Sequence, residues 1–318
     1  MKIEKLIIKK AREKAGARIV LSEASLSSEV LQSGLRAAKM GICKIILLGD
    51  SSLKKFESKN VEVINPKTYK RLGQMQNFLF ELRREKGLSL EAAKKLLKDL
   101  NYFGVVLVKM GFADGMVSGK VSETKNVIKP ALQIIKTRKG VHMASSCTLM
   151  LGKQNYNFAD CGLVKYPSAG ELCDIAKESA CSTEKLLGVR AKVAFLSFAT
   201  LGSADGASVD NIKSAMASLK RQKAKFEFEG PLQVDSAINK EVAKFKAPNS
   251  KIAGFCNTLV FPNLDAGNIG YKLFREGSGC RCVGPLVQGL AKPVNDVSRG
   301  ASVEEILLTI AITVLQID

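Results

Sequence analysis

Two loops of the sequence combine the residue types that bind phosphate. The first contains Ser118, Gly119 and Thr124, and the second, residues 295–302, contains Arg299. Each follows an apolar stretch and opens a helical pattern, so its backbone N–H groups and the helix dipole favour an anion. Glycine permits close backbone approach, and arginine can hold a phosphate through two parallel hydrogen bonds. Such loops also occur as ordinary helix caps, so each is a weak signal alone.

The second loop leads into a pattern that gives Glu305 two alternative roles. Ser302 and Glu305 form an S-x-x-E capping box, in which the carboxylate folds back onto the start of its helix. Beside an anion site, the same carboxylate would serve as a general base. Spacing alone favours the cap and leaves both interpretations open.

The positive charge of the chain is interpreted first as a lysine-rich solvated surface and second as a field that attracts small anionic ligands. The 318 residues include 49 Lys and Arg against 30 Asp and Glu, a formal net charge of +19. The basic residues are interspersed with acidic ones, aromatic residues make up only 6 %, and Trp is absent. Nucleic acid is therefore not predicted as a partner, whereas a positive field would draw small anions towards a site.

Familiar cofactor and metal motifs are missing. No G-x-G-x-x-G follows a predicted strand, and residues 115–121 lack the glycine spacing of a P-loop. Cys280 and Cys282 form a lone C-x-C, and His142 is the single histidine, so no metal site is predicted. A Ser-His-Asp hydrolase would need His142, but no G-x-S-x-G motif accompanies it.

The sequence predicts a cytoplasmic location and no membrane partner. Its longest apolar stretch, residues 306–315, is shorter than the ~20 residues that cross a bilayer. Residues 1–11 mix Lys and Glu with Ile and Leu, unlike a signal peptide. Eight cysteines spread over this length are expected to be reduced thiols.

Short apolar runs alternate with helical patterns along almost the whole chain. Strands are predicted at residues 18–21, 44–48, 61–64, 115–117, 143–150, 192–198 and 258–261. Helices are predicted at residues 27–40, 69–85, 90–100, 168–187, 208–220 and 302–316, with a further one reaching from the first loop to residue 134. The alternation is typical of an α/β protein with mostly parallel sheets, and the length suggests two domains.

Several segments resemble phosphate acetyltransferase (phosphotransacetylase) sequences of the phosphate acetyl/butyryltransferase family. They are residues 113–119, 130–137, 267–272, and 284–296 with 298–300. They follow one another in consistent order, and the resemblance extends from Glu23 to the last helix. This resemblance implies two α/β domains similar in fold to isocitrate and isopropylmalate dehydrogenases, with the active site in the cleft between them, and a homodimer. It implies that residues 1–140 and 288–318 form the first domain and residues 141–287 the second.

The resemblance also implies the reversible reaction of acetyl-CoA with phosphate to give acetyl phosphate and CoA. In the expected ternary complex, the CoA thiolate attacks acetyl phosphate. CoA is then a substrate, and no tightly bound cofactor is expected. A phosphate butyryltransferase and a non-catalytic module that binds CoA or acyl phosphates are the alternatives.

Individual positions follow the family pattern to different degrees. Ser298 and Arg299 match its active-site serine and arginine, and Arg83 matches a substrate-binding arginine. Glu305 stands where the family usually has an aspartate proposed as the catalytic base, and Lys129 stands where it usually has an arginine. Lysine keeps the charge but loses the planar two-pronged grip, so we expect altered phosphate binding and not its loss.

The remaining site residues complete the prediction. Tyr271 and Lys272 are expected in the cleft, and Ser118, Gly119 and Thr124 are expected to bind substrate. Ala301 stands where a cysteine often follows Ser-Arg-Gly in the family, which excludes an acyl-cysteine at that position.

Overall fold

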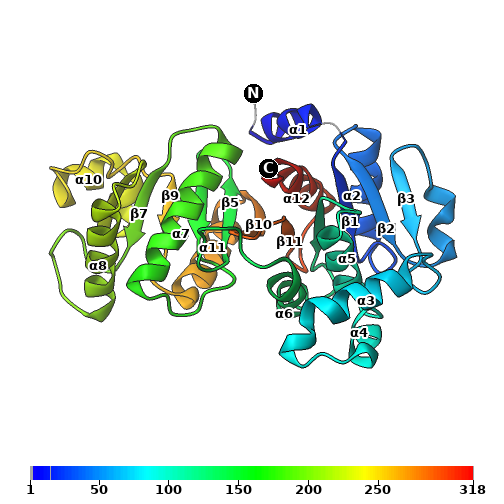
Figure 1. Cartoon of the computed structure of the whole chain (residues 1–318). Helices are drawn as coiled ribbons and strands as arrows, with labels where there is room; N and C mark the ends of the chain where they lie inside the picture. Colours follow the sequence, from blue (N-terminus) through cyan, green and yellow to red (C-terminus); the bar gives the residue numbers. More distant parts are fainter. Residues whose placement is uncertain (1–2, 15, 318) are drawn as a thin grey trace. The chain divides into compact units, whose positions relative to one another are not determined.

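The computed structural model describes residues 3–14 and 16–317, in which strands and helices alternate (Figure 1). The chain divides into two compact units, Met1–Lys139 with Leu290–Asp318, and Gly140–Gly289. Each unit is built of helices around one sheet, so the predicted α/β class with mainly parallel sheets is confirmed. Among the described residues, no helix combines the length and hydropathy needed to cross a bilayer.

The first unit contains a five-stranded parallel sheet in the order β11-β4-β1-β2-β3. Its strands are β1 (Arg18–Leu21), β2 (Lys44–Leu48), β3 (Val61–Ile64), β4 (Gly115–Ser118) and β11 (Val294–Asp296). The chain moves outward from β1 to β3 and then returns to β4 on the other side of β1. The loops after β1 and β4 therefore diverge at a topological switch point, where ligands bind in open α/β sheets.

Helices cover both faces of this sheet. They are α1 (Ile3–Glu13), α2 (Ser28–Lys39), α3 (Leu72–Arg83), α4 (Leu90–Leu96), α5 (Leu100–Lys109), α6 (Thr124–Pro130) and α12 (Val303–Gln316), with short turns η1 (Ser51–Phe56), η2 (Arg84–Lys86) and η3 (Ala131–Ile135). A Cβ at Gly34 of α2 would lie 2.5 Å from Leu21 Cδ1, and one at Gly104 of α5 would lie 3.2 Å from Val20 Cγ1. Since consecutive strand residues point to opposite faces, α2 and α5 pack closely on opposite sides.

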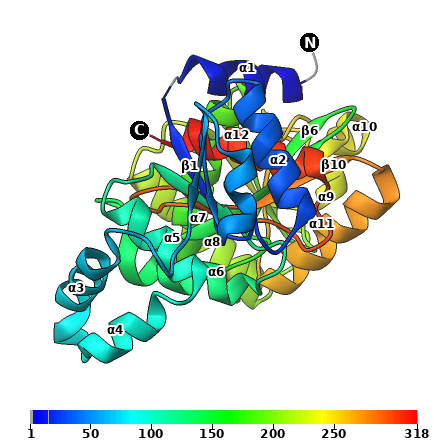
Figure 2. The same cartoon turned by 90° about the vertical axis from the view of Figure 1, so that its right-hand side faces the viewer.

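Two helices of this unit differ from the sequence prediction. The pattern over residues 90–100 covers the whole of α4, a short turn and the first residue of α5, because Asp99 caps α5. Its Oδ1 accepts hydrogen bonds from the N–H groups of Asn101 and Tyr102, at 2.8 and 3.1 Å. Helix α1 was not predicted. Helices α3 and α4 lie side by side (Figure 2).

The second unit contains a mixed six-stranded sheet in the order β10-β5-β6-β9-β7-β8. Its strands are β5 (Ser145–Leu151), β6 (Asn155–Ala159), β7 (Lys192–Leu196), β8 (Glu227–Leu232), β9 (Thr258–Val260) and β10 (Arg281–Gln288). The pairs β10·β5 and β5·β6 are antiparallel, and the remaining pairs are parallel. The predictions for β5, β7 and β9 are confirmed within a few residues, whereas β6, β8 and β10 were not predicted.

Aromatic packing anchors the last helix of the second unit. Its helices are α7 (Ala169–Ser182), α8 (Ala207–Arg221), α9 (Val234–Ile238), α10 (Lys240–Lys246) and α11 (Leu264–Ser278), and α7 continues into the π turn η4 (Thr183–Leu187). The Phe158 ring centroid lies 5.4 Å from that of Phe261 and 5.5 Å from that of Phe274 on α11. This core fixes α11, which carries Tyr271 and Lys272.

Candidate active site

The two loops predicted from the sequence meet in the first unit. They leave the carboxyl ends of the neighbouring parallel strands β4 and β11. The Val297 N–H donates to the Ser118 carbonyl oxygen at 2.8 Å. Lys120 Nζ donates to the carbonyl oxygens of Arg299 and Ala301, at 2.8 and 2.9 Å. The first loop thus holds the second in shape.

The backbone of the first loop encloses a carboxylate of the protein itself. Glu23 follows β1 and is only 1 % exposed. Its Oε2 accepts hydrogen bonds from the N–H groups of Gly119, Lys120 and Val121, at 3.0, 2.7 and 3.1 Å. Its Oε1 accepts one from the Ser122 N–H at 2.7 Å. The loop does bind an anion, as its residue types suggest, but that anion is Glu23.

Two of the residues predicted to bind substrate lie inside the loop. Ser118 is buried, and its hydroxyl donates to Asn101 Oδ1 at 2.6 Å. Gly119 is buried with a φ of +104°, and a methyl group there would overlap Asp296 Oδ1. Both therefore shape the loop, and their role in substrate binding stays a prediction. Thr124 is exposed at the start of α6, and its hydroxyl donates to Asp296 Oδ2 at 2.7 Å.

Asn101 joins the loops that follow β1 and β4. Its Oδ1 also accepts from the Ser22 hydroxyl at 2.9 Å, and its Nδ2 donates to the Ser122 hydroxyl at 3.0 Å. The sequence analysis missed Asn101 and the role of Glu23. Ser22 and Glu23 come directly after a short apolar strand, and that position at a switch point is the signal that could have identified them.

Asp296 is a second buried carboxyl group at this edge. It is 2 % exposed, and no hydrogen-bond partner for its Oδ1 occurs within residues 3–14 and 16–317. Burial raises the pKa of Asp296 to about 7, and the negative charge of Glu23 adds to this effect. The Thr124 hydroxyl and the charge of Arg299 oppose it. The carboxyl group is therefore partly protonated near neutral pH.

This raised pKa predicts a pH-dependent effect of Asp296→Asn. Folding favours the protonated form, so the contribution of Asp296 to stability is full below its ordinary pKa of 3.8 and is lost as pH rises through about 7. The amide has no charge to desolvate. Between pH 5 and pH 8, the variant is expected to gain about 2–3 kcal/mol of unfolding free energy relative to the parent chain. Urea unfolding at both pH values measures this; a difference independent of pH would contradict it.

The capping box predicted at the start of α12 is confirmed. Glu305 Oε2 accepts hydrogen bonds from the Ser302 N–H and hydroxyl, at 2.8 and 3.1 Å, and the Ser302 hydroxyl accepts one from the Glu305 N–H at 3.3 Å. Glu305 is 7 % exposed. The cap holds the carboxylate in one place, a few residues after Arg299.

Arg299 lies exposed at the tip of the second loop. The turn around it is closed by the Ala301 N–H, which donates to the Ser298 carbonyl oxygen at 2.8 Å. The Ser298 hydroxyl accepts a longer bond from the Gly300 N–H, at 3.3 Å. Together with the bonds from Lys120, these contacts fix the backbone and leave the guanidinium group at the surface.

Arg83 and Lys129 are brought to one segment of the first unit. Arg83 ends α3, and its Nη1 donates to the Gln133 carbonyl oxygen at 2.9 Å. Lys129 is exposed on the last turn of α6, four residues before Gln133. The Tyr102 hydroxyl donates to Gln133 Oε1 at 2.8 Å and steadies this segment. Two cations therefore flank the turn that follows α6.

Tyr271 and Lys272 lie on α11 in the second unit. Tyr271 is half-buried against the core of that unit, and Lys272 is exposed. The Lys272 ammonium lies 5.8 Å from the centre of the Tyr271 ring. Their role in substrate binding stays a prediction.

Most cysteines are poorly suited to act as nucleophiles. No disulfide joins any of the eight in the described part of the chain, and the buried ones are Cys43, Cys147, Cys161, Cys173, Cys256 and Cys282. Burial raises the pKa of Cys43, Cys147 and Cys256 to about 12. These thiols stay protonated at neutral pH, and the thiolate is the reactive form. Cys181 is exposed and Cys280 is half-buried.

Comparison with known proteins identifies the family. The family model described as phosphate acetyl/butaryl transferase matches residues 2–314. The chain belongs to this family. The phosphate acetyltransferase of Clostridium acetobutylicum is 39 % identical, with 94 % of each chain covered. That of Helicobacter pylori is 42 % identical over 97 % of this chain, which spans 61 % of that relative. A phosphotransacetylase crystal structure from Streptococcus pyogenes superimposes with a TM-score of 0.90 at 39 % identity, covering 98 % of both chains.

Proposed function

We propose that this chain catalyses the reversible transfer of an acetyl group between CoA and inorganic phosphate. The observation that carries the proposal is the match, over almost the whole of both chains, to a relative named phosphate acetyltransferase. The loop geometry supports it, because the exposed Arg299 stands on a turn held by hydrogen bonds, six residues before the capped carboxylate of Glu305. Acetyl phosphate and CoA are the substrates, and no tightly bound cofactor is expected.

The proposed reaction is thiolate attack within a ternary complex. Glu305 accepts the proton of the CoA thiol, whose pKa of ~8.5 leaves only a few per cent thiolate at neutral pH. The thiolate forms a C–S bond with the acetyl carbonyl carbon, and the C–O bond to phosphate breaks. Arg299 and Ser298 stabilise the charge that develops on the carbonyl oxygen and on the departing phosphate. Acetyl-CoA and inorganic phosphate are the products.

Other side chains bind and orient the substrates in this proposal. Arg83 and Lys129 supply positive charge for phosphate groups, and Thr124 lies at the exposed start of α6. Tyr271 and Lys272 contribute from α11. Glu23 takes no direct part in the reaction, since its carboxylate is buried and accepts hydrogen bonds from four backbone N–H groups.

Mixing the purified chain with acetyl phosphate and CoA tests the proposal. Acetyl-CoA is expected, detected by thioester absorbance and mass spectrometry. Binding of CoA without thioester formation would instead indicate a non-catalytic module. Because the family description includes butaryl transferases, butyryl phosphate is compared in the same assay. A higher kcat/KM with butyryl phosphate would show that the longer acyl group is the preferred substrate. One methylene in a hydrophobic acyl pocket changes the transition-state binding free energy by ~1–3 kcal/mol.

The same material distinguishes the ternary complex from a covalent relay through cysteine. Without CoA, acetyl phosphate is expected to leave the protein mass unchanged, because most thiols are buried and protonated. An acetylated cysteine that passes its acetyl group to added CoA would contradict direct transfer. The homodimer and the cytoplasmic location stay predictions; light scattering tests the first.

A further inference from the structure

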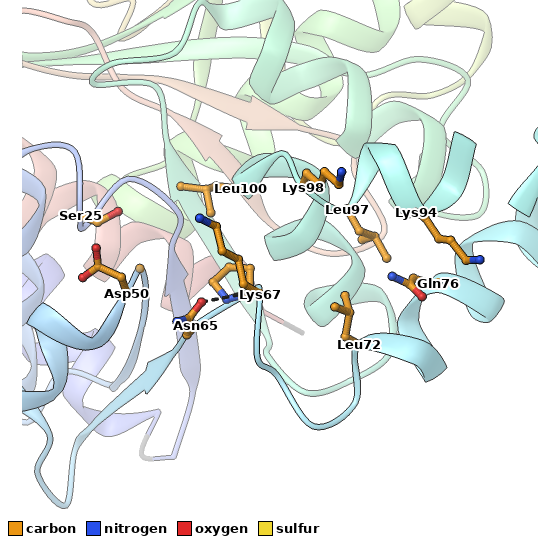
Figure 3. A pocket seen from close by; sticks show the side chains of 12 residues that line it. Ser25, Asp50, Asn65, Lys67, Leu72, Gln76, Lys94, Leu97, Lys98 and Leu100 are labelled. Carbon is orange, nitrogen blue, oxygen red and sulfur yellow. Dashed lines mark hydrogen bonds between the residues drawn. The ribbon is translucent and has the colours of Figure 1, made fainter. Parts of the chain in front are cut away.

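A cavity of about 790 Å³ lies in the first unit and is lined by none of the proposed catalytic residues. One side is formed by the loops that follow β1, β2 and β3, and the other by α3, α4 and the turn after α4 (Figure 3). Cavities of ~300–1,000 Å³ hold small organic ligands. The carboxyl ends of parallel strands are the usual position for such ligands in α/β folds.

The strand side of the cavity is polar and shaped by local hydrogen bonds. Asp50 follows β2, and its Oδ1 accepts from the Ser52 N–H at 2.9 Å. Asn65 follows β3, and its Oδ1 accepts from the Lys67 N–H at 3.0 Å. The hydrogen bonds of Ser52 lower the pKa of Asp50, and the charge of Lys67 lowers it further. Asp50 is therefore an ionised acceptor in a defined position.

The helix side supplies an apolar wall with cations along it. Leu72 and Leu97 line the cavity, and Leu97 is almost fully buried. Lys94 and Lys98 line it as well, so that together with Lys67 three lysines line the cavity, against the single carboxylate of Asp50. Lys94 Nζ lies 3.8 Å from Glu91 Oε1. Both side chains are exposed, so this ion pair is weak and an anionic ligand can replace Glu91 as the partner of Lys94.

We propose that this cavity binds a nucleoside phosphate. The apolar wall suits the face of a base, a carboxylate suits ribose hydroxyl groups, and the lysines suit phosphate charges. A purely apolar ligand would provide no anion for Lys67 and Lys98, which line the cavity. Inorganic phosphate alone would fill only a small part of the volume. The ligand is either the nucleotide end of CoA or a free nucleotide, and the proposal does not depend on acyl transfer.

Calorimetric titration with adenosine 3′,5′-bisphosphate and with ADP, at fixed ionic strength, tests this assignment. The test variant is Lys67→Ala with Lys98→Ala. The control is Lys95→Ala, because Lys95 is an equally exposed lysine of α4 that does not line the cavity. We expect the double variant to raise the dissociation constant of at least one probe tenfold or more, and the control to change it less than twofold.

Competition identifies the source of the nucleotide. If CoA displaces the probe and the double variant raises the KM for CoA, the cavity holds the nucleotide end of the substrate. If the probe binds and CoA does not displace it, the ligand is a free nucleotide. The proposal is overturned if neither probe binds, or if Lys95→Ala weakens binding as much as the double variant. Binding needs no turnover, so inactivity in the thioester assay leaves this result interpretable.

Discussion

Glu305→Gln is expected to lower kcat by ~10²–10⁴-fold while leaving the stability of the chain close to that of the parent. Glutamine still accepts hydrogen bonds from the Ser302 N–H and hydroxyl group, so the capping box survives. It cannot take a proton from the CoA thiol. Steady-state kinetics with acetyl phosphate and CoA, together with the melting temperature, measure both effects on one sample.

Ser302→Ala is the matched control for this substitution. It removes the hydroxyl group that caps α12 and should cost ~1 kcal/mol of unfolding free energy. The carboxylate of Glu305 remains, so kcat should fall much less than in Glu305→Gln. If Glu305→Gln keeps near-native turnover, Glu305 is a cap and the base must be sought elsewhere. The pair of variants thus separates proton transfer from helix capping.

Arg299→Ala is expected to lower kcat/KM by ~10²–10³-fold, the effect of removing one donor that stabilises a developing oxyanion. The backbone around Arg299 is held by Lys120 and by the Ala301 N–H, so the loop should keep its shape without the side chain. The loss then reflects the guanidinium group itself. Kinetics with varied acetyl phosphate at saturating CoA measure it.

Two further substitutions make this result specific. Arg299→Lys keeps the charge but not the two-pronged geometry, so an intermediate loss is expected. Arg12→Ala removes an exposed arginine of α1 and should leave kcat/KM within twofold. Equal losses in Arg299→Ala and Arg12→Ala would show that only the net charge of the protein matters. Native turnover in Arg299→Ala would remove the arginine from the proposed mechanism.

The sequence predicted the strands of the first unit where they are apolar, and missed the strand that carries polar residues. Strand β11 contains Asn295 and Asp296, both buried, so its pattern indicated a loop. Asn295 is tolerated there because its Nδ2 donates to Thr313 Oγ1 and Gln316 Oε1, at 2.8 and 2.6 Å. Partners from a distant helix cannot be read from a local pattern.

In the candidate site too, contacts between residues close in the sequence were predicted, and contacts between residues far apart in the sequence were not. The capping box of Ser302 and Glu305 depends on residues three apart, and the sequence predicted it. The partner of the first loop did not follow from its residue types, because Glu23 lies 96 residues before Gly119. A loop that favours anions therefore says nothing about which anion occupies it. Only the order of strands in the sheet brings that carboxylate into place.

The place of β11 in the first sheet has a consequence for biosynthesis. On the ribosome, β1 to β4 are made first, and the whole of the second unit is made before β11 and α12 appear. Until then, β4 is an edge strand that pairs only with β1, and exposed edge strands can pair with other chains. This edge stays open while the 176 residues from Gly119 to Val294 are translated. The loop that carries Arg299 can therefore form only after the other four strands of its sheet and the whole second unit have been synthesised.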